Sequence, residues 1–196
     1  MKTNVRKNFK LAQRYLLLHN LSMKNTILPF FFLFFMCCCF AGCKPALPPA
    51  APKAANTAQT ITVNQLLQRF AANTDTVYVY NFWATWCKPC VAELPWFEKL
   101  GQQYAGKKLK ITLISLDFLE QTQTRVNPFI KEKGLQSDVF VLDGGNDPNA
   151  WINQIDPAWS GAIPATLIIH PPSGFRKFYE REFTFDALDA IVSPHL

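Results

Sequence analysis

The most informative stretch of this chain of 196 residues reads Asn81-Phe82-Trp83-Ala84-Thr85-Trp86-Cys87-Lys88-Pro89-Cys90. It joins a near-continuous apolar run, residues 77–83, to a segment with helical patterning, residues 90–104. An apolar run of this kind is typical of a strand buried on both faces. Two thiols separated by two residues at such a junction can close a disulfide without a large movement of the backbone. The stretch therefore predicts a buried strand, a cysteine pair and then a helix.

The two cysteines differ in the surroundings that this arrangement predicts. Cys87 is expected at the helix N-terminus, where unpaired N–H groups and the helix dipole favour an anion. Lys88 adds a positive charge beside it, and both effects lower the pKa of a thiol. Because the thiolate is the attacking species, Cys87 is the predicted nucleophile. Cys90 is expected one turn into the helix and less exposed, placed to resolve a mixed disulfide.

Outward from this stretch, predicted strands alternate with predicted helices and a hairpin follows. The predicted strands are residues 77–83, 110–116, 139–142, 165–170 and 175–182, and a short segment, residues 60–63, precedes the first helix. The predicted helices are residues 64–72, 90–104, 126–133, 149–155 and a last one capped by Thr184. This order indicates an α/β layer fold with a mixed central sheet.

In the stretch from Asn81 to Cys90, the chain resembles thioredoxin-like proteins, and most closely the TlpA/ResA type of membrane-anchored thiol–disulfide oxidoreductase. The resemblance covers roughly residues 60–196. Pro95 matches a proline inside the active-site helix, and residues 163–166, Ile-Pro-Ala-Thr, look like the family's cis-proline loop. The resemblance implies a thioredoxin-like three-layer fold. The 47 residues between Leu116 and Pro164 leave room for an inserted helix–strand unit, residues 126–142.

The resemblance also implies where substrate binds. The cis-proline loop of the family opposes the disulfide and pairs with the substrate backbone, which assigns binding roles to Ile163 and Pro164. Around the nucleophile, we expect Trp86, Lys88 and Pro89 to form the rest of the substrate-binding surface.

Proton handling is expected to depend on Glu93. Thioredoxins have a buried Asp six residues before the first cysteine, but this chain has Asn81 there, which cannot titrate. Glu93 follows Cys90 by three residues and so lies on the same helical face. ResA-type proteins have a functional Glu at this position. A carboxylate near a buried thiol raises both pKa values and can shuttle the proton of Cys90.

The overall charge of the chain does not describe its folded part. The formal net charge is +6. Six basic residues precede residue 25, whereas no acidic residue occurs before Asp75. From residue 25 onward, 14 basic and 14 acidic residues balance. We therefore expect no nucleic-acid partner for the folded part.

The N-terminal region has the pattern of an export signal. A short basic region, an apolar stretch and small residues before a cysteine describe a secretory signal, and Ala41-Gly42-Cys43 resembles the lipobox of bacterial lipoproteins. We interpret residues 1–22 as an artefactual preamble, residues 23–42 as a lipoprotein signal and Cys43 as the lipidation site. Residues 43–59 form a Pro/Ala-rich tether, and residues 60–196 form the thioredoxin-like domain.

Several other interpretations of the cysteine pair are open at this point. A structural disulfide would close too small a loop to stabilise the fold much. A zinc site would need a second ligand pair. If residues 165–170 run away from Pro164 as a strand, His170 at the strand end lies ~17 Å away, which also argues against a copper site, and we expect His195 at a frayed chain end. A peroxidase of the peroxiredoxin type resembles Pro-x-x-x-Thr-x-x-Cys, whereas Thr85 stands two residues before Cys87. A surface binding module with an inert disulfide is the non-enzymatic alternative.

The combined expectation is an extracytoplasmic thiol–disulfide oxidoreductase, monomeric and lipid-anchored to a bacterial membrane on its periplasmic side. It would use the Cys87–Cys90 pair as its redox group, with no metal and no further cofactor. The resemblance favours reduction of disulfides in exported proteins, for example apocytochrome c, with electrons from a membrane thiol donor.

Overall fold

The computed structural model describes residues 56–145, 147 and 149–196. The preamble, the signal, Cys43 and most of the tether therefore lie outside the described residues. The strands are β1 (Gln59–Thr62), β2 (Val77–Trp83), β3 (Leu109–Ser115), β4 (Asp138–Asp143), β5 (Ala165–His170) and β6 (Phe175–Tyr179). The helices are α2 (Val63–Phe70), α3 (Lys88–Gln103), α4 (Asn127–Lys133), α5 (Asn149–Ile155) and α6 (Phe185–Val192).

The six strands form one mixed sheet in the order β1-β4-β3-β2-β5-β6. The four strands from β1 to β2 run parallel to one another, and β5 and β6 run antiparallel to their neighbours. The predicted mixed sheet and the β5–β6 hairpin are confirmed. However, β6 ends at Tyr179, earlier than the predicted residue 182, because the chain then leaves the sheet and the Phe183 N–H donates to Glu93.

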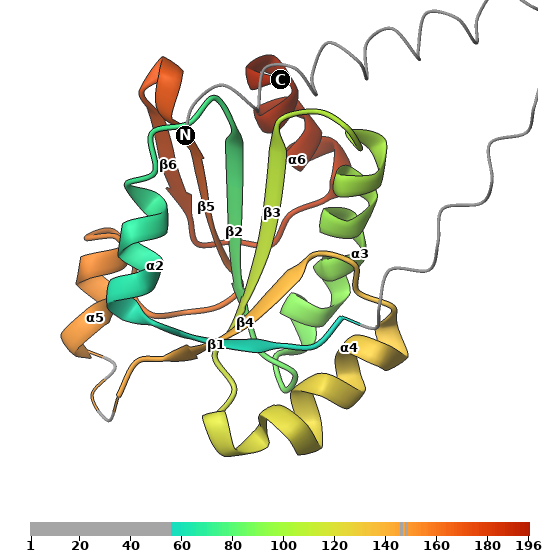
Figure 1. Cartoon of the computed structure of the whole chain (residues 1–196), viewed down its shortest axis with the longest axis vertical. Helices are drawn as coiled ribbons and strands as arrows, with labels where there is room; N and C mark the ends of the chain where they lie inside the picture. Colours follow the sequence, from blue (N-terminus) through green and yellow to red (C-terminus); the bar gives the residue numbers. More distant parts are fainter. Residues whose placement is uncertain (1–55, 146, 148) are drawn as a thin grey trace, which may run out of the picture. The chain divides into compact units, whose positions relative to one another are not determined.

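The alternation of side chains along β2 separates two apolar layers. Val79 and Trp83 lie on the face covered by α3, α4 and α6, whereas Tyr80 and Phe82 lie on the face covered by α2 and α5 (Figure 1). Successive side chains of a strand point to opposite faces. Asn81, between Val79 and Trp83, therefore belongs to the α3 face, although it is polar and fully buried. This three-layer arrangement matches the predicted fold class.

The inserted helix–strand unit is present as α4 and β4. A π-helical turn, Thr122–Val126, precedes α4, so the helix begins one residue later than predicted. The helix ends at Lys133, and Gly134, its C-cap residue, has a φ of 65°, a left-handed conformation that favours glycine. Strand β4 lies inside the sheet between β1 and β3. The insertion therefore extends the central layer itself.

The N-terminal boundary of the domain lies before residue 60. Gln59, which we assigned to the tether, is the first residue of β1 and pairs with Phe140 of β4. The Ala58 N–H donates to Asn127 Oδ1 at 2.9 Å, and the Asn56 amide donates to the Ser137 carbonyl. The boundary was wrong because the inserted β4 offers a sheet edge to these residues.

None of the helices in the described residues is both long enough and apolar enough to cross a membrane.

Candidate active site

The two cysteines of the motif are joined in a disulfide at the start of α3. The sulfur–sulfur distance is 2.03 Å and the Cα atoms are 5.3 Å apart. Cys87 is the N-cap residue of the helix, and its sulfur accepts the Cys90 N–H at 3.3 Å. This N–H and the helix dipole favour a thiolate at Cys87 once the bond is reduced. Cys90 is fully buried and Cys87 is 6% exposed, so Cys87 is the sulfur that another molecule can reach.

A loop that ends in a cis peptide bond faces the disulfide. The Ile163–Pro164 bond is cis, as the resemblance implied. The Ile163 carbonyl oxygen lies 3.8 Å from Cys87 Sγ. Because a disulfide sulfur carries no proton, this approach is a van der Waals contact, and only the reduced thiol can donate here. The structure thus brings Ile163, from the loop before β5, to the sulfur at the start of α3.

Glu93 is buried behind the disulfide, on the same helix. Only 2% of its surface is exposed, although it carries an ionisable group. Its Oε1 accepts the Asn81 side-chain amide at 2.8 Å, and its Oε2 accepts the Phe183 N–H at 2.7 Å. Burial raises the pKa of Glu93 to about 7, although both hydrogen bonds lower it; the nearby charge of Glu182 adds to the increase. A carboxyl group with this pKa can hold or release a proton near neutral pH.

Asn81 is the partner that links Glu93 to the sheet. Its Nδ2 also lies 3.2 Å from Thr166 Oγ1 on β5, next to the cis-proline loop. Its carbonyl oxygen has no partner within the part of the chain that the structure describes. An amide presents donors on one side and an acceptor on the other. By turning over, Asn81 can therefore serve both the charged and the protonated form of Glu93.

A second buried carboxylate, Asp117, holds the loop that precedes Cys87. Asp117 Oδ2 accepts the Thr85 N–H at 2.9 Å and the Ser115 hydroxyl at 2.8 Å. Its Oδ1 accepts the Thr85 hydroxyl at 2.5 Å. The segment after β3 therefore fixes the backbone between β2 and Cys87. Sequence reasoning missed this residue.

A third carboxylate, Glu180, holds the cis-proline loop from the other side. Its Oε2 accepts the Ser160 N–H at 3.0 Å, and its Oε1 accepts the Ser160 hydroxyl and the Ala162 N–H, the latter at 3.2 Å. These hydrogen bonds, led by that of the Ser160 side chain, hold the pKa of Glu180 below its usual value. Between the two partners, Gly161 has a φ of 95°, which disfavours any residue with a side chain. Sequence reasoning did not predict these hydrogen bonds between Glu180 and the loop.

A known protein family matches the part of the chain that contains the disulfide and the cis-proline loop. A family model described as the AhpC/TSA family matches residues 50–174, more than half of the chain. The chain belongs to the AhpC/TSA family. The thiol-disulfide oxidoreductase ResA of Oceanobacillus iheyensis is 32% identical to this family member over 113 residues. That match covers 58% of this chain and 54% of ResA, so the chain spans about half the length of this curated relative.

Two solved structures share the fold of this AhpC/TSA family member. The thioredoxin-related protein from Neisseria meningitidis serogroup B has a TM-score of 0.53 and 24% identity, and covers 64% of this chain and 88% of its own. The thiol:disulfide interchange protein of the thioredoxin family from Chlorobium tepidum has a TM-score of 0.50 and 21% identity. That match covers 74% of this chain and 99% of the Chlorobium protein. The expected thioredoxin-like fold is confirmed.

The remaining site residues lie where the motif puts them. Trp86 is 58% exposed, Lys88 is exposed and Pro89 is half-buried, all beside Cys87 in the chain. His170 lies at the end of β5 as expected. His195 is not frayed, because its ring packs 5.3 Å from that of His170. The described residues contain no group of three or more His, Cys, Asp or Glu side chains that could hold a metal ion.

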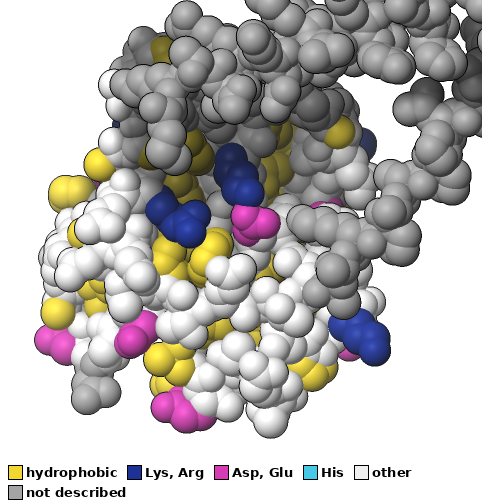
Figure 2. Space-filling view, in the orientation of Figure 1, with side chains coloured by type: hydrophobic (Ala, Val, Ile, Leu, Met, Phe, Trp, Pro, Cys, Tyr) yellow, Lys and Arg dark blue, Asp and Glu magenta, His cyan; other side chains and the backbone are white. Residues whose placement is uncertain are grey.

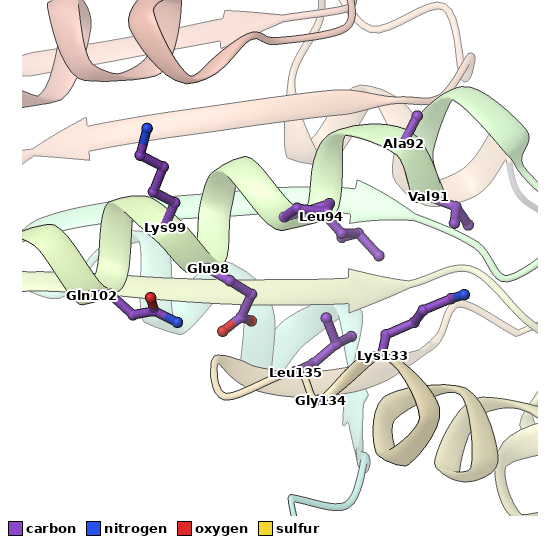
Figure 3. A pocket seen from close by; sticks show the side chains of 10 residues that line it. Val91, Ala92, Leu94, Glu98, Lys99, Gln102, Lys133, Gly134 and Leu135 are labelled. Carbon is purple, nitrogen blue, oxygen red and sulfur yellow. The ribbon is translucent and has the colours of Figure 1, made fainter.

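A groove of about 460 Å³ follows one side of α3 (Figure 3). Leu94, Glu98 and Leu135 line it, and neither cysteine does. Glu98 points across to the segment after α4, where its carboxylate accepts the N–H groups of Gln136 and Ser137 at 2.9 and 3.0 Å. Glu98 therefore joins α3 to the inserted unit.

Proposed function

We propose that this protein is a thiol–disulfide oxidoreductase that exchanges its Cys87–Cys90 disulfide with cysteine pairs of other proteins. The observation that carries the proposal is the disulfide at the N-terminus of α3, with Cys87 facing the Ile163 carbonyl of a cis-proline loop. The similarity to a thiol-disulfide oxidoreductase supports it. The disulfide is the redox group of the proposed reaction.

In the reductive direction, the reaction consists of two exchange steps. The Cys87 thiolate attacks one sulfur of a substrate disulfide, which forms a mixed disulfide and releases one substrate thiolate. The Cys90 thiolate then attacks the sulfur of Cys87, re-forms the Cys87–Cys90 disulfide and releases the second substrate thiolate. Two electrons pass to the substrate, and its thiolates take up two protons. A thiol donor must then reduce the protein disulfide again.

Glu93 supplies the proton chemistry of the second step in this proposal. Cys90 must lose its proton before it attacks, although it is fully buried. Glu93 is three residues further along α3, equally enclosed, and has a pKa of about 7. A group that titrates near the working pH is suited to accept that proton and return it.

The substrate backbone is proposed to lie along Ile163 and Pro164, with its flanking residues over Trp86, Lys88 and Pro89. The proposal also includes the finer features expected from the sequence. These are a lipid anchor at Cys43, an extracytoplasmic location, a monomeric state, a membrane thiol donor and exported protein substrates such as apocytochrome c. The small residues before Cys43 and the resemblance to ResA-type proteins support them.

Insulin reduction by the purified full chain, with dithiothreitol as donor, tests the function. We expect turnover by the wild type, none above background in Cys87→Ser, and a trapped mixed disulfide in Cys90→Ser. Wild-type protein without activity would instead favour a binding module with an inert disulfide. Consumption of hydrogen peroxide in a parallel assay would favour the peroxidase alternative.

The pH dependence of Cys90 alkylation in the reduced protein tests the role of Glu93. A nearby carboxylate raises the pKa of a thiol, so Glu93→Gln should make Cys90 react at lower pH. Glu98→Gln is the matched control, because Glu98 lies on the same helix but bonds to Gln136 and Ser137. An unchanged profile in Glu93→Gln would remove Glu93 from the mechanism.

A further inference from the structure

Glu180 is an exposed residue, yet its carboxylate is bound to a single short segment of the chain. The Ser160 and Ala162 N–H groups donate to it at 3.0 and 3.2 Å, and the Ser160 hydroxyl donates as well. Figure 2 shows acidic side chains scattered singly over one face of the molecule, as expected for carboxylates that bind water. Three donors from one segment distinguish Glu180 from such residues.

The register of the sheet brings Glu180 to this segment. Strand β6 ends at Tyr179, which pairs with Thr166 of β5 in an antiparallel ladder. Because antiparallel strands run in opposite directions, the residue after Tyr179 lies beside the residues that precede Thr166. The strand pairing therefore places the Glu180 carboxylate against the loop that leads into β5.

The backbone of Ala162 is held from two sides. Its N–H donates to Glu180, and its carbonyl oxygen accepts the Trp159 indole N–H at 2.8 Å. Trp159 is buried in the core, so this second partner is fixed by packing. Ile163 is the next residue, and its carbonyl oxygen lies 3.8 Å from Cys87 Sγ. The position of that oxygen therefore depends on how firmly the residue before it is held.

A carbonyl oxygen beside Cys87 opposes the effect of the helix N-terminus. In the reduced protein, the Cys87 thiol can donate to the Ile163 carbonyl oxygen, and a hydrogen bond to the neutral form of a group disfavours its charged form. The oxygen also carries a partial negative charge, which repels a thiolate. The Cys90 N–H and the dipole of α3 act in the opposite direction. The fraction of Cys87 that ionises therefore depends on a balance between α3 and the loop.

We propose that Glu180 is a positioning residue that holds the Ile163 carbonyl oxygen beside Cys87 and thereby favours the thiol of Cys87 over the thiolate. It acts through its hydrogen bonds to residues 160–162. The inference rests on the proposed function, in which Cys87 is the attacking sulfur. A thiolate that is less stabilised makes the reduced form less favourable, so these hydrogen bonds shift the Cys87–Cys90 pair toward reducing its partners.

The pH dependence of Cys87 alkylation in the reduced full chain tests this role, with iodoacetamide as the probe and mass spectrometry to identify the modified cysteine. Glu180→Ala removes the acceptor for all three donors, so the loop can move away from the sulfur. On the acidic side of the profile, we expect Cys87 to react about fivefold faster, the effect of one hydrogen bond. The charged groups on neighbouring segments are unchanged in this variant: Lys88 and Glu93 on α3, Asp117 and Glu120 after β3, and Arg181 and Glu182 after β6.

Two further variants separate positioning from general loss of stability. Glu180→Gln keeps one acceptor oxygen and replaces the other with a donor, so it should give a smaller shift in the same direction. Asp189→Ala is the matched control, because the Asp189 carboxylate also accepts hydrogen bonds from a distant segment, Gln103 and Tyr104 at the C-terminal end of α3. It should leave the Cys87 profile unchanged.

The equilibrium with glutathione gives a second measurement. Two glutathione thiols reduce the Cys87–Cys90 disulfide to the dithiol and leave as one glutathione disulfide. At neutral pH, Glu180→Ala should shift this equilibrium toward the dithiol.

An unchanged or reversed alkylation profile in Glu180→Ala, or an equal shift in Asp189→Ala, would overturn the role of Glu180. If Glu180→Ala does not fold, the profile of Glu180→Gln decides the outcome in the same way. Neither measurement requires turnover of a protein substrate, whereas a wild type that does not reduce insulin would overturn the proposed function.

Discussion

Glu93 and Asp117 are two carboxylates near one disulfide, equally buried at 2% exposure, with different surroundings. Asp117 accepts three hydrogen bonds, and two of them come from the backbone and side chain of Thr85. Glu93 accepts two, from Asn81 and from the Phe183 N–H, and burial still raises its pKa to about 7. The same chemical group is therefore used in two ways.

The difference shows how partners determine what a buried carboxylate can do. Donors concentrated on one loop make the Asp117 carboxylate a fixed point for the chain before Cys87. The two hydrogen bonds to Glu93 lower its pKa by less than burial raises it. The pKa of this carboxyl group, three residues after Cys90, therefore lies near neutral pH. The first carboxylate is suited to hold a conformation, and the second is suited to exchange a proton.

Removal of the Asp117 carboxylate should have the largest effect on stability. Asp117→Ala leaves two donors on Thr85 and one on Ser115 without their acceptor, and hydrogen bonds to charged groups contribute about 1.5–3 kcal/mol each. We expect the free energy of unfolding to fall by about 4 kcal/mol, measured by urea denaturation with the disulfide intact. Glu120→Ala, at an exposed position nearby, should change it by less than about 0.5 kcal/mol. If Asp117→Ala lowered the free energy of unfolding by no more than the control does, Asp117 would not have the structural role that distinguishes it from Glu93.

The pH dependence of stability should separate the two residues next. Because the pKa of Glu93 rises from 4.5 to about 7 on folding, the folded state binds more protons between these values. The stabilisation is complete below pH 4.5 and is lost as pH rises through 7. The difference between the pKa of Glu93 in the unfolded and in the folded state corresponds to about 3 kcal/mol of unfolding free energy. Glu93→Gln should remove this slope in urea titrations across that range, and a slope that persists would assign the proton to another group.

The smallest expected effect comes from Glu182. Its negative charge contributes to the raised pKa of Glu93, as the weakest of the causes. Glu182→Gln should therefore lower the pKa of Glu93 slightly, by the equivalent of about 0.5 kcal/mol. NMR titration of the Glu93 carboxyl carbon would measure the shift, with Glu132→Gln as an exposed control on α4. No shift would leave burial and the two hydrogen bonds as the whole explanation.

Short-range patterns predicted the local structure around the two cysteines. The apolar run predicted β2 at its observed bounds, and the spacing of Cys87, Cys90 and Glu93 predicted their shared helix. Period-two alternation along β2 also places Asn81 on the side of α3, which is how a polar residue in an apolar strand meets Glu93. These relations depend on neighbours within about one turn or one strand, so the sequence contains them directly.

Longer-range relations could not be predicted in the same way. Asp117 meets Thr85 across 32 positions, and Phe183 meets Glu93 across 90. Nothing in the local pattern around Asp117 or Phe183 distinguishes them from ordinary loop residues, because their partners are set by strand order. The same cause places the first strand of the domain from Gln59 and ends β6 at Tyr179, because the ends of both strands depend on which strand lies beside them.

The position of β1 also determines how the domain would respond to mechanical load. A pull on the N-terminal segment enters through Asn56 and Ala58 and passes to β1, a four-residue strand at the edge of the sheet paired with β4. Strands β4 and β3 separate β1 from β2, which leads to the disulfide. The first structure to yield would be the β1–β4 pairing. Two strands therefore separate the end of β2, which leads to the disulfide, from a load applied at the N-terminal segment.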